Sequence, residues 1–303
     1  MRYYRLSGLT IATELEFPGG IPLPPDAGNA DIVARLGTLP PALETPTRRG
    51  PFWSLDGRDF LLVLPGIGRF LARDGRELVM QPDEGVTEAD ALPFLLGTAF
   101  GALMYQRGTT LLHASAIVRN DRAFAFAGRS GIGKSTLAAA LGQSGGVFAS
   151  DDILALAGDE DGPVHIRPDG RRLKLFLPSI ATLELADRQG PPVRPCIEKY
   201  YVEPGATVEG EPLLDAVYML TEASPVRPAA ITRLGPVDAA QALMQHTYRR
   251  RLAQATLGEA SYARQIGALV RRVPVYLLSR PRGLDLLGIT LEMLDTHWRG
   301  QGG

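Results

Sequence analysis

An eight-residue glycine-rich run constrains the fold more than any other part of this 303-residue chain. Residues 128–135 read GRSGIGKS, which matches the pattern G-x-x-x-x-G-K-[ST] of a phosphate-binding loop. An apolar run at 123–127 precedes it, and helix-forming residues at 134–143 follow, with two glycines at 145–146 to end that helix. This order of strand, loop and helix predicts a mixed α/β domain around the loop.

The chemistry of phosphate binding explains each residue type in the pattern. Glycines let backbone N–H groups point inward at phosphate oxygens, and a helix that begins at Lys134 adds the positive end of its dipole. Lys134 would place a positive charge on the β- and γ-phosphates, and Ser135 would offer its hydroxyl to Mg²⁺. The residues predicted to bind ATP are Gly128, Ser130, Gly131, Ile132, Gly133, Lys134, Ser135 and Thr136.

An acidic pair follows the next expected strand, at residues 147–150. Asp151 and Asp152 come only one short helix after the loop, so they should lie at the carboxyl edge of the sheet, where ligands bind in α/β proteins. Because side chains alternate along an extended strand, the two carboxylates should point in different directions. One could hold Mg²⁺ while the other faces the acceptor; a solvated Asp-Asp turn is the alternative.

One of the four histidines lies near these residues. His113 falls in the run 111–118, which is expected to be a strand that pairs with the strand entering the loop. A structural role is the alternative for His113. It is the expectation for the other three, His165, His246 and His297.

The chain divides into an expected β-rich domain at 1–86, with a structural or a substrate- or partner-binding role, and an expected catalytic domain at 87–303. Strands are predicted at 3–9, 31–36, 60–64, 69–72, 77–80 and 273–279, with Asp74-Gly75 as a hairpin turn. Loops are predicted at 17–25, 39–51 and 185–212. Helices are predicted at 87–106, 238–256, 260–271 and 283–297.

Bulk properties limit the classes of partner. The formal net charge is −1, which gives no electrostatic reason to expect nucleic acid or a membrane surface. The longest apolar stretch, at 91–104, is too short to cross a bilayer. The single cysteine, Cys196, excludes an internal disulfide and fits a reducing cytoplasm. We therefore expect a cytoplasmic protein that binds neither nucleic acid nor membrane.

At these residues the chain resembles the HPr kinase/phosphorylase family, which is related to phosphoenolpyruvate carboxykinase. The resembling pieces are LHAS at 112–115, the loop at 128–135 and ASDD at 149–152, in the family's order and spacing. The resemblance implies an α/β fold with a P-loop, HPr kinase-like C-terminal core. It also implies ATP-dependent phosphorylation of a serine on a peptide or protein, and it suggests a homo-oligomer.

The same resemblance implies a role for each matching residue. Lys134 and the loop glycines would bind phosphates, and Ser135 and Asp152 would hold Mg²⁺. Asp151 would be the base that receives the serine proton, with His113 tuning or assisting it. The expected catalytic residues are therefore Asp151, His113 and Lys134.

Two features of the bifunctional family are missing. An acidic residue and arginine in a Gly-Leu-Gly context do not follow Asp152, where the chain has RRLKLFLP at 171–178. The late Pro-Gly-Arg element is replaced by PVYLLSRPR at 274–282, so phosphorylase activity is not expected. The layout is more similar to the HPr kinase-related enzymes of lasso peptide gene clusters, through YRLSGLTIA at 4–12 and the 274–282 element. That similarity implies phosphorylation of the C-terminal serine of a precursor peptide.

Other interpretations stay open: an HPr-type protein serine kinase, a small-molecule kinase, and a non-enzymatic nucleotide-binding regulator whose N-terminal part docks a partner. From Val226 to the end there are 11 arginines and 5 acidic residues. The cations Lys174, Lys199, Arg280 and Arg282 are candidate contacts for nucleotide or substrate. The run of arginines at 249–251 is expected to be a solvated helix face, and binding of a chain-terminal carboxylate or a phosphate is the alternative.

Overall fold

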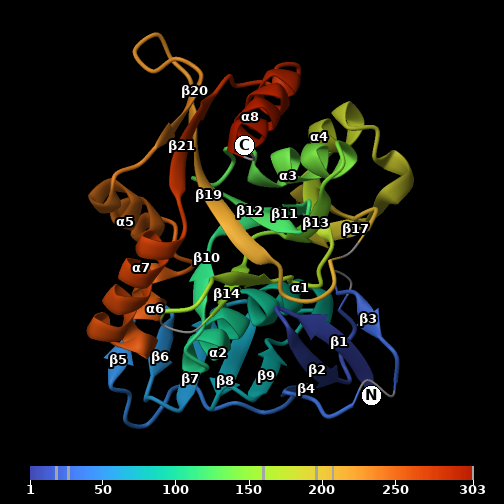
Figure 1. The fold of residues 1–303 in the computed structure, drawn as a ribbon. Coiled ribbons are helices and arrows are strands. Elements are labelled where there is room, and N and C mark those ends of the chain that lie inside the picture. Colours follow the sequence, from blue (N-terminus) through green and yellow to red (C-terminus); the bar gives the residue numbers. More distant parts are fainter. Residues whose placement is uncertain (18–19, 26–27, 159–160, 195–196, 207, 302–303) are drawn as a thin grey trace.

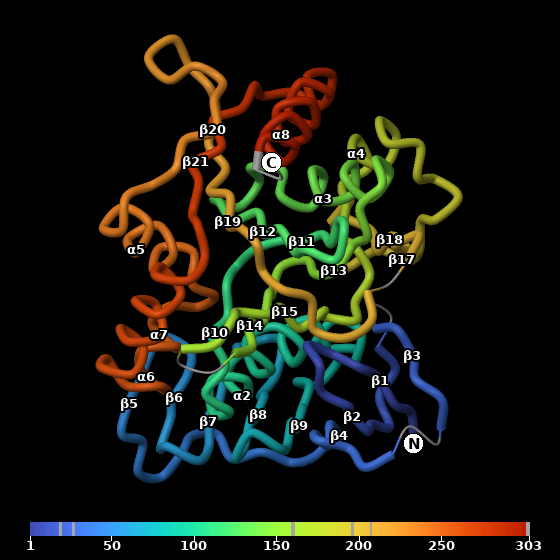
Figure 2. Tube along the Cα trace, viewed as in Figure 1, coloured from blue at the N-terminus to red at the C-terminus, as the bar shows by residue number. Residues whose placement is uncertain are grey.

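A computed structural model describes residues 1–17, 20–25, 28–158, 161–194, 197–206 and 208–301. The molecule is layered, with a sheet at the N-terminal end, a helical segment over it, a second sheet, and further helices at the far end (Figure 1). The chain begins beside the first sheet, and its last helix lies in the layer at the other end of the molecule (Figure 2). The expected mixed α/β fold class is confirmed. The single cysteine of the chain, Cys196, lies outside the described residues.

The first sheet has nine strands in the order β3-β1-β2-β4-β9-β8-β7-β6-β5. They are β1 (Arg2–Leu6), β2 (Leu9–Thr13), β3 (Pro22–Leu23), β4 (Ile32–Leu36), β5 (Arg48–Arg49), β6 (Trp53–Leu55), β7 (Asp59–Leu64), β8 (Gly68–Arg73) and β9 (Glu77–Pro82). The expected hairpin turn is confirmed, because Asp74 and Gly75 have φ of 50° and 66°. The single strand expected at 3–9 is wrong, since Ser7 and Gly8 also have positive φ and form a turn.

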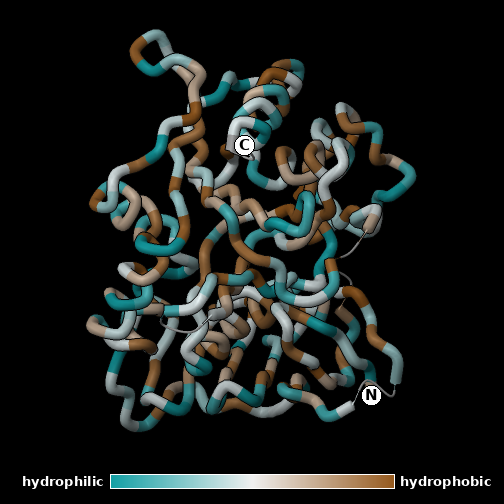
Figure 3. Tube along the Cα trace, viewed as in Figure 1, coloured by the Kyte–Doolittle hydropathy of each residue, from teal (hydrophilic) through white to brown (hydrophobic). Residues whose placement is uncertain are grey.

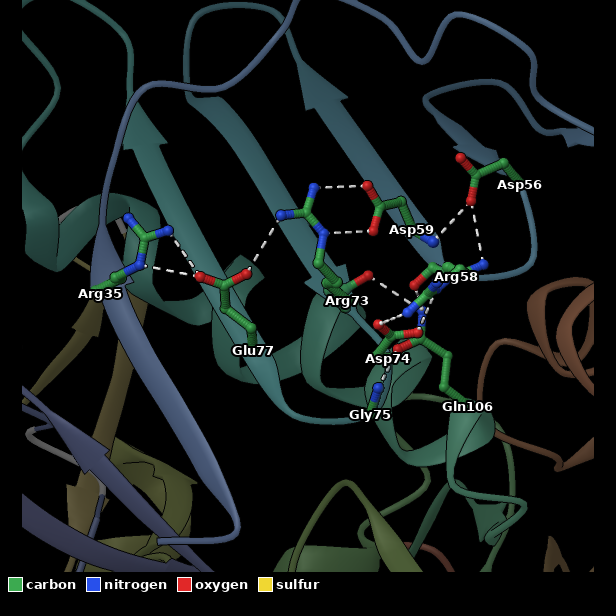
Figure 4. Close-up of polar contacts among 10 residues, drawn as sticks. Arg35, Asp56, Arg58, Asp59, Arg73, Asp74, Gly75, Glu77 and Gln106 are labelled. Atoms are coloured by element: carbon green, nitrogen blue, oxygen red, sulfur yellow. Dashed lines mark hydrogen bonds and ion pairs between the residues drawn. The ribbon is translucent and has the colours of Figure 1, made fainter.

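A long helical segment packs on the inner face of this sheet. It consists of α1 (Glu88–Phe94), the π-helix η1 (Leu95–Ala99) and α2 (Phe100–Gln106), so the helix expected at 87–106 is confirmed. The π-helical turn follows Pro93, whose missing N–H interrupts the regular hydrogen-bond ladder. The Gln106 side chain joins this segment to the sheet: its carbonyl accepts the Gly75 N–H at 2.9 Å (Figure 4).

The outer face of the sheet carries cross-strand ion pairs. Arg73 pairs with Asp59 at 2.7 Å and Glu77 pairs with Arg35 at 2.7 Å, each across neighbouring strands (Figure 4). Arg58 pairs in turn with Asp74 at the hairpin turn. Part of this face is covered by Leu39 and Leu43, which join a small apolar cluster with strand residues. The loops expected at 17–25 and 39–51 are wrong where they contain the short strands β3 and β5.

The second sheet has the order β10-β14-β15-β19-β12-β11-β13, with β21 beside β19 and β20 beside β21. Its strands are β10 (Thr110–Leu112), β11 (Ala114–Arg119), β12 (Arg122–Ala127), β13 (Val147–Ser150), β14 (Leu154–Ala157), β15 (His165–Arg167), β19 (Leu213–Glu222), β20 (Ala230–Arg233) and β21 (Val275–Arg280). Strand β12 is parallel to β19, which is parallel to β21. The long central strand β19 was not predicted.

Alternation along β12 separates the two cores of the molecule. Ala123 and Ala125 face the first sheet and its helices, whereas Phe124 and Phe126 face the helices of the far layer. In Figure 3 the traces of these central strands contain many brown, hydrophobic residues. The first core joins residues from both sides of position 86, and the domain boundary there stays a prediction.

The far layer and the flank contain the remaining elements. They are α3 (Lys134–Gln143), the sheet of β16 (Leu173–Phe176), β18 (Ile197–Val202) and β17 (Gln189–Arg194), α4 (Leu177–Thr182), η2 (Ala186–Arg188), α5 (Pro236–Gln245), α6 (Arg250–Leu257), α7 (Glu259–Arg272) and α8 (Leu287–Gln301). The loop predicted at 185–212 is therefore wrong, because β17 and β18 pair there. The single helix predicted at 238–256 is also wrong, because Arg249 has φ of 47° and separates α5 from α6. Among the described residues, no helix combines the length and apolar character needed to span a bilayer.

Candidate active site

A cavity of about 690 Å³ lies where the carboxyl ends of four strands meet. The glycine loop follows β12, the two aspartates follow β13, Glu222 ends β19 and Arg280 ends β21. Ligands bind at this edge in α/β sheets. Every residue predicted to act at the site lines the cavity except Gly128: these are His113, Ser130, Gly131, Ile132, Gly133, Lys134, Ser135, Thr136, Asp151 and Asp152.

The loop has the backbone geometry that its glycines predict. Gly131 and Gly133 have φ of 79° and 93°, and α3 begins at Lys134 as expected. The Lys134 ammonium donates to the carbonyl of Gly128 at 2.9 Å and to that of Arg129 at 3.3 Å, which closes the loop on itself. Burial lowers the pKa of Lys134, while the nearby charges of Asp151 and Asp152 oppose that shift. A buried cation of this kind is suited to an anionic ligand.

Asp151 is buried and lies directly beside the loop. Its Oδ1 accepts hydrogen bonds from the hydroxyls of Ser115 and Ser135, both at 2.7 Å, and its Oδ2 accepts the Lys174 N–H at 3.3 Å. Ser115 belongs to the run that carries the family resemblance, but the sequence did not predict a role for its side chain. Its hydroxyl fixes the carboxylate that faces Ser135.

Asp152 points away from Asp151, toward His113. The Asp152 Oδ1 lies 3.1 Å from His113 Nδ1, which also lies 2.9 Å from the Asp152 carbonyl oxygen. Burial disfavours the charged Asp152 carboxylate, but the hydrogen bond from His113 and the charges of Lys174 and Arg171 outweigh it, so its pKa lies below the usual range. The expected divergence of the two carboxylates is observed, although the cause is a turn with φ of 78° at Asp152.

His113 lies in a break between strands, not within one as predicted. The chain changes neighbours at this residue, because β10 pairs with β14 whereas β11 pairs with β12 and β13. The backbone N–H of His113 therefore donates to the backbone carbonyl of His246 at 2.7 Å. The predicted pairing of the following residues with the strand that enters the loop is confirmed by Ala114 opposite Ala127.

The cations of the chain are unevenly placed. It contains three lysines, Lys134, Lys174 and Lys199, and all of them line this cavity. Arg280 also lines it, is 8% exposed, and donates to the carbonyl of Ile132 within the loop while its Nε has no hydrogen-bond partner. Arg282 at the same strand end also lines the cavity and pairs with Glu222 at 3.6 Å. This charge distribution fits a polyanionic ligand such as a nucleotide triphosphate.

Asp169 holds the backbone beside the site, a role that no sequence pattern predicted. This fully buried carboxylate accepts the backbone N–H of Asp151 at 3.0 Å and that of Arg171 at 2.9 Å. Burial raises the Asp169 pKa to about 7, against the opposing charge of Arg171. The Asp169 carbonyl also accepts the N–H of Ser7, in the β1–β2 turn, so the first sheet contacts the back of the site.

The oxygen ligands near the loop fit Mg²⁺ in its usual protein setting. Ser135 and Asp151 bring two hard oxygen atoms to one point, while no group of three or more His, Cys, Asp and Glu among the described residues could hold a metal. Mg²⁺ usually takes one or two protein ligands and completes its shell with water and substrate phosphates. The site thus fits a metal that arrives with a nucleotide.

Comparisons with known proteins show a distant likeness to solved structures. No family model and no curated protein match the chain. A solved structure, the Hpr(Ser) kinase/phosphatase from Coxiella burnetii, matches 64% of this chain and 93% of its own, with 14% sequence identity and a TM-score of 0.35. A likeness of this degree assigns no function, which has to be inferred from the residues of the cavity.

Proposed function

We propose that the protein is an ATP- and Mg²⁺-dependent kinase that phosphorylates a serine hydroxyl of a peptide. One cavity carries the proposal: in it a glycine loop with Lys134 faces two carboxylates that have different partners. Phosphoryl transfer requires the protein to hold phosphates and metal, neutralise charge, and orient the acceptor. A nucleotide-binding regulator needs the first of these but not a second carboxylate beside a histidine.

The hydrogen bonds favour an exchange of the roles that the family resemblance implies for the aspartates. Asp151 shares a hydrogen bond with Ser135, so we assign Asp151 to Mg²⁺ and Asp152 to the acceptor. When bound, Mg²⁺ neutralises charge on the transferred phosphate. Lys134 would exchange its two carbonyl partners for phosphate oxygens, which would relieve the cost of burying its charge.

Asp152 and His113 form a pair suited to an alcohol. The low pKa keeps the Asp152 carboxylate ionised near neutral pH, so it can accept a hydrogen bond from a serine hydroxyl and orient it. Because His113 Nδ1 faces two oxygen acceptors, the neutral ring carries its proton there and Nε2 is the basic nitrogen. Asp152 would take up the proton that the serine loses, while the Nδ1–H of His113 holds that carboxylate in place.

Mass spectrometry of candidate peptides tests the proposal. With ATP and Mg²⁺, a peptide that ends in serine, including a lasso precursor, should gain phosphate, and the same peptide ending in alanine should not. Lys134→Ala should remove this activity, while Arg233→Ala, an exposed cation outside the cavity, should keep it. Nucleotide binding without transfer to any hydroxyl would favour a regulator, and transfer to small alcohols alone would favour a small-molecule kinase.

A further inference from the structure

A second cavity, separate from the active site, lies between the first sheet and helix α6. Its volume is about 510 Å³, and it is lined largely by apolar side chains from β6, β7 and α1, among them Trp53, Leu64 and Phe94. Phe52, at its edge, is 56% exposed, which is unusual for a phenylalanine without a partner. We name this cavity the arginine groove, because Arg249, Arg250 and Arg251 form its other wall.

The charges of the arginine groove are uncompensated. Its lining contains three arginines and no acidic residue, and no ion pair of these arginines occurs among the described residues. Arg250 and Arg251 also open helix α6, where the positive end of the helix dipole disfavours cations. The three arginines are exposed and solvated, and they offer an anion three positive groups with no acidic side chain in the lining.

One short segment connects the arginine groove to the candidate active site. The carbonyl of His246 accepts the His113 N–H, and the Tyr248 ring lies 6.3 Å from the His113 ring. Tyr105 donates to the Tyr248 carbonyl, and the Tyr248 N–H donates to Leu111 at 3.0 Å, so the segment is held in place. Arg249 follows directly, in a left-handed conformation that is strained for a non-glycine residue and that turns the chain into the groove.

We infer that the arginine groove binds a segment of the peptide substrate that carries an aliphatic or aromatic side chain next to aspartate or glutamate. The inference rests on the proposed kinase function. The apolar floor takes the hydrophobic side chain, and the arginines pair with the carboxylates. A nucleic acid is the poorer match, because cations line only one wall and the floor facing them is apolar.

A peptide array in which apolar and acidic content vary independently tests the inference. The wild-type protein should retain peptides that contain both residue types. Arg250→Ser/Arg251→Ser and, separately, Phe52→Ser should each weaken the best such peptide by about tenfold or more, equivalent to about 1.4 kcal/mol. Arg76→Ser/Arg233→Ser removes two exposed arginines elsewhere and should bind as the wild type does. Thermal melts of each variant confirm that it is folded.

Two results would overturn the inference. One is equal peptide retention by wild type and both groove variants; the other is preferential, salt-sensitive retention of an oligonucleotide at the groove. Mg·ATP affinity is measured on the same proteins and should be unchanged in the groove variants. If the wild-type protein retains the peptides but neither binds nucleotide nor transfers phosphate, the proposed kinase function is rejected instead.

Discussion

Among single residues, the two adjacent aspartates have different partners, so substitution of each should have a different effect on ATP affinity and on phosphate transfer. Asp151→Asn should weaken Mg²⁺-dependent ATP affinity, because it removes negative charge beside Ser135. Asp152→Asn should leave that affinity nearly unchanged and slow phosphate transfer by about 10²–10⁴-fold. Titrations of ATP at several Mg²⁺ concentrations, with single-turnover rates, separate the effects. The reverse outcome would restore the roles that the family resemblance implies.

A second residue-scale prediction concerns the pH dependence of stability. The Asp169 pKa is raised from 3.8 to about 7, so between these values the folded state keeps a proton that the unfolded state has released. The free energy of unfolding should therefore fall as pH rises through this window. In urea titrations without nucleotide, the free energy of unfolding of Asp169→Asn should fall less steeply with pH than that of the wild type. Asp187→Asn, at an exposed carboxylate, should follow the wild type, and parallel curves for all three proteins would contradict the prediction.

At the scale of an element, two glycines of the phosphate-binding loop form a matched pair. Gly131 and Gly133 both have positive φ, so alanine at either should lower the free energy of unfolding by about 1–2 kcal/mol. A Cβ at Gly131 would meet nothing within 4 Å, but one at Gly133 would lie 2.6 Å from the Arg280 guanidinium. Gly133→Ala should therefore displace Arg280 and weaken Mg·ATP binding more than Gly131→Ala does. Equal losses in calorimetric titrations would argue against a role for Arg280.

At the scale of the whole molecule, one apolar core joins the first sheet to the catalytic layer. Leu95, Phe100 and Leu103 are fully buried and belong to the same cluster as Phe60 and Phe70 of the sheet. A fragment of residues 87–303 would expose these side chains. Each exposed side chain lowers the free energy of unfolding by about 1.5–3 kcal/mol, and a typical domain has only about 5–15 kcal/mol in total. The fragment should show no cooperative thermal transition and should bind a hydrophobic dye. A cooperative transition with retained Mg·ATP binding would show that the two predicted domains fold separately.

Local sequence signals specify the parts of the site that are contiguous in the chain. The strand, loop and helix around Lys134 follow from local signals: an apolar run, glycines that permit positive φ, and a helix that starts where the glycines end. The Asp74-Gly75 turn and the strand before Asp151 were predicted for the same reason. These features depend on neighbouring residues, so local propensity specifies them.

Contacts between groups that are distant in the chain arise from the packing of the whole fold. The pairing of Asp151 with Ser115 and Asp152 with His113 depends on strand order, and the support from Asp169 depends on a buried contact with the first sheet. Strand β19, with no hairpin signal beside it, was missed because parallel partners come from far along the chain. The arginines at 249–251 are exposed, as expected, but only long-range packing places them opposite apolar side chains of the first sheet.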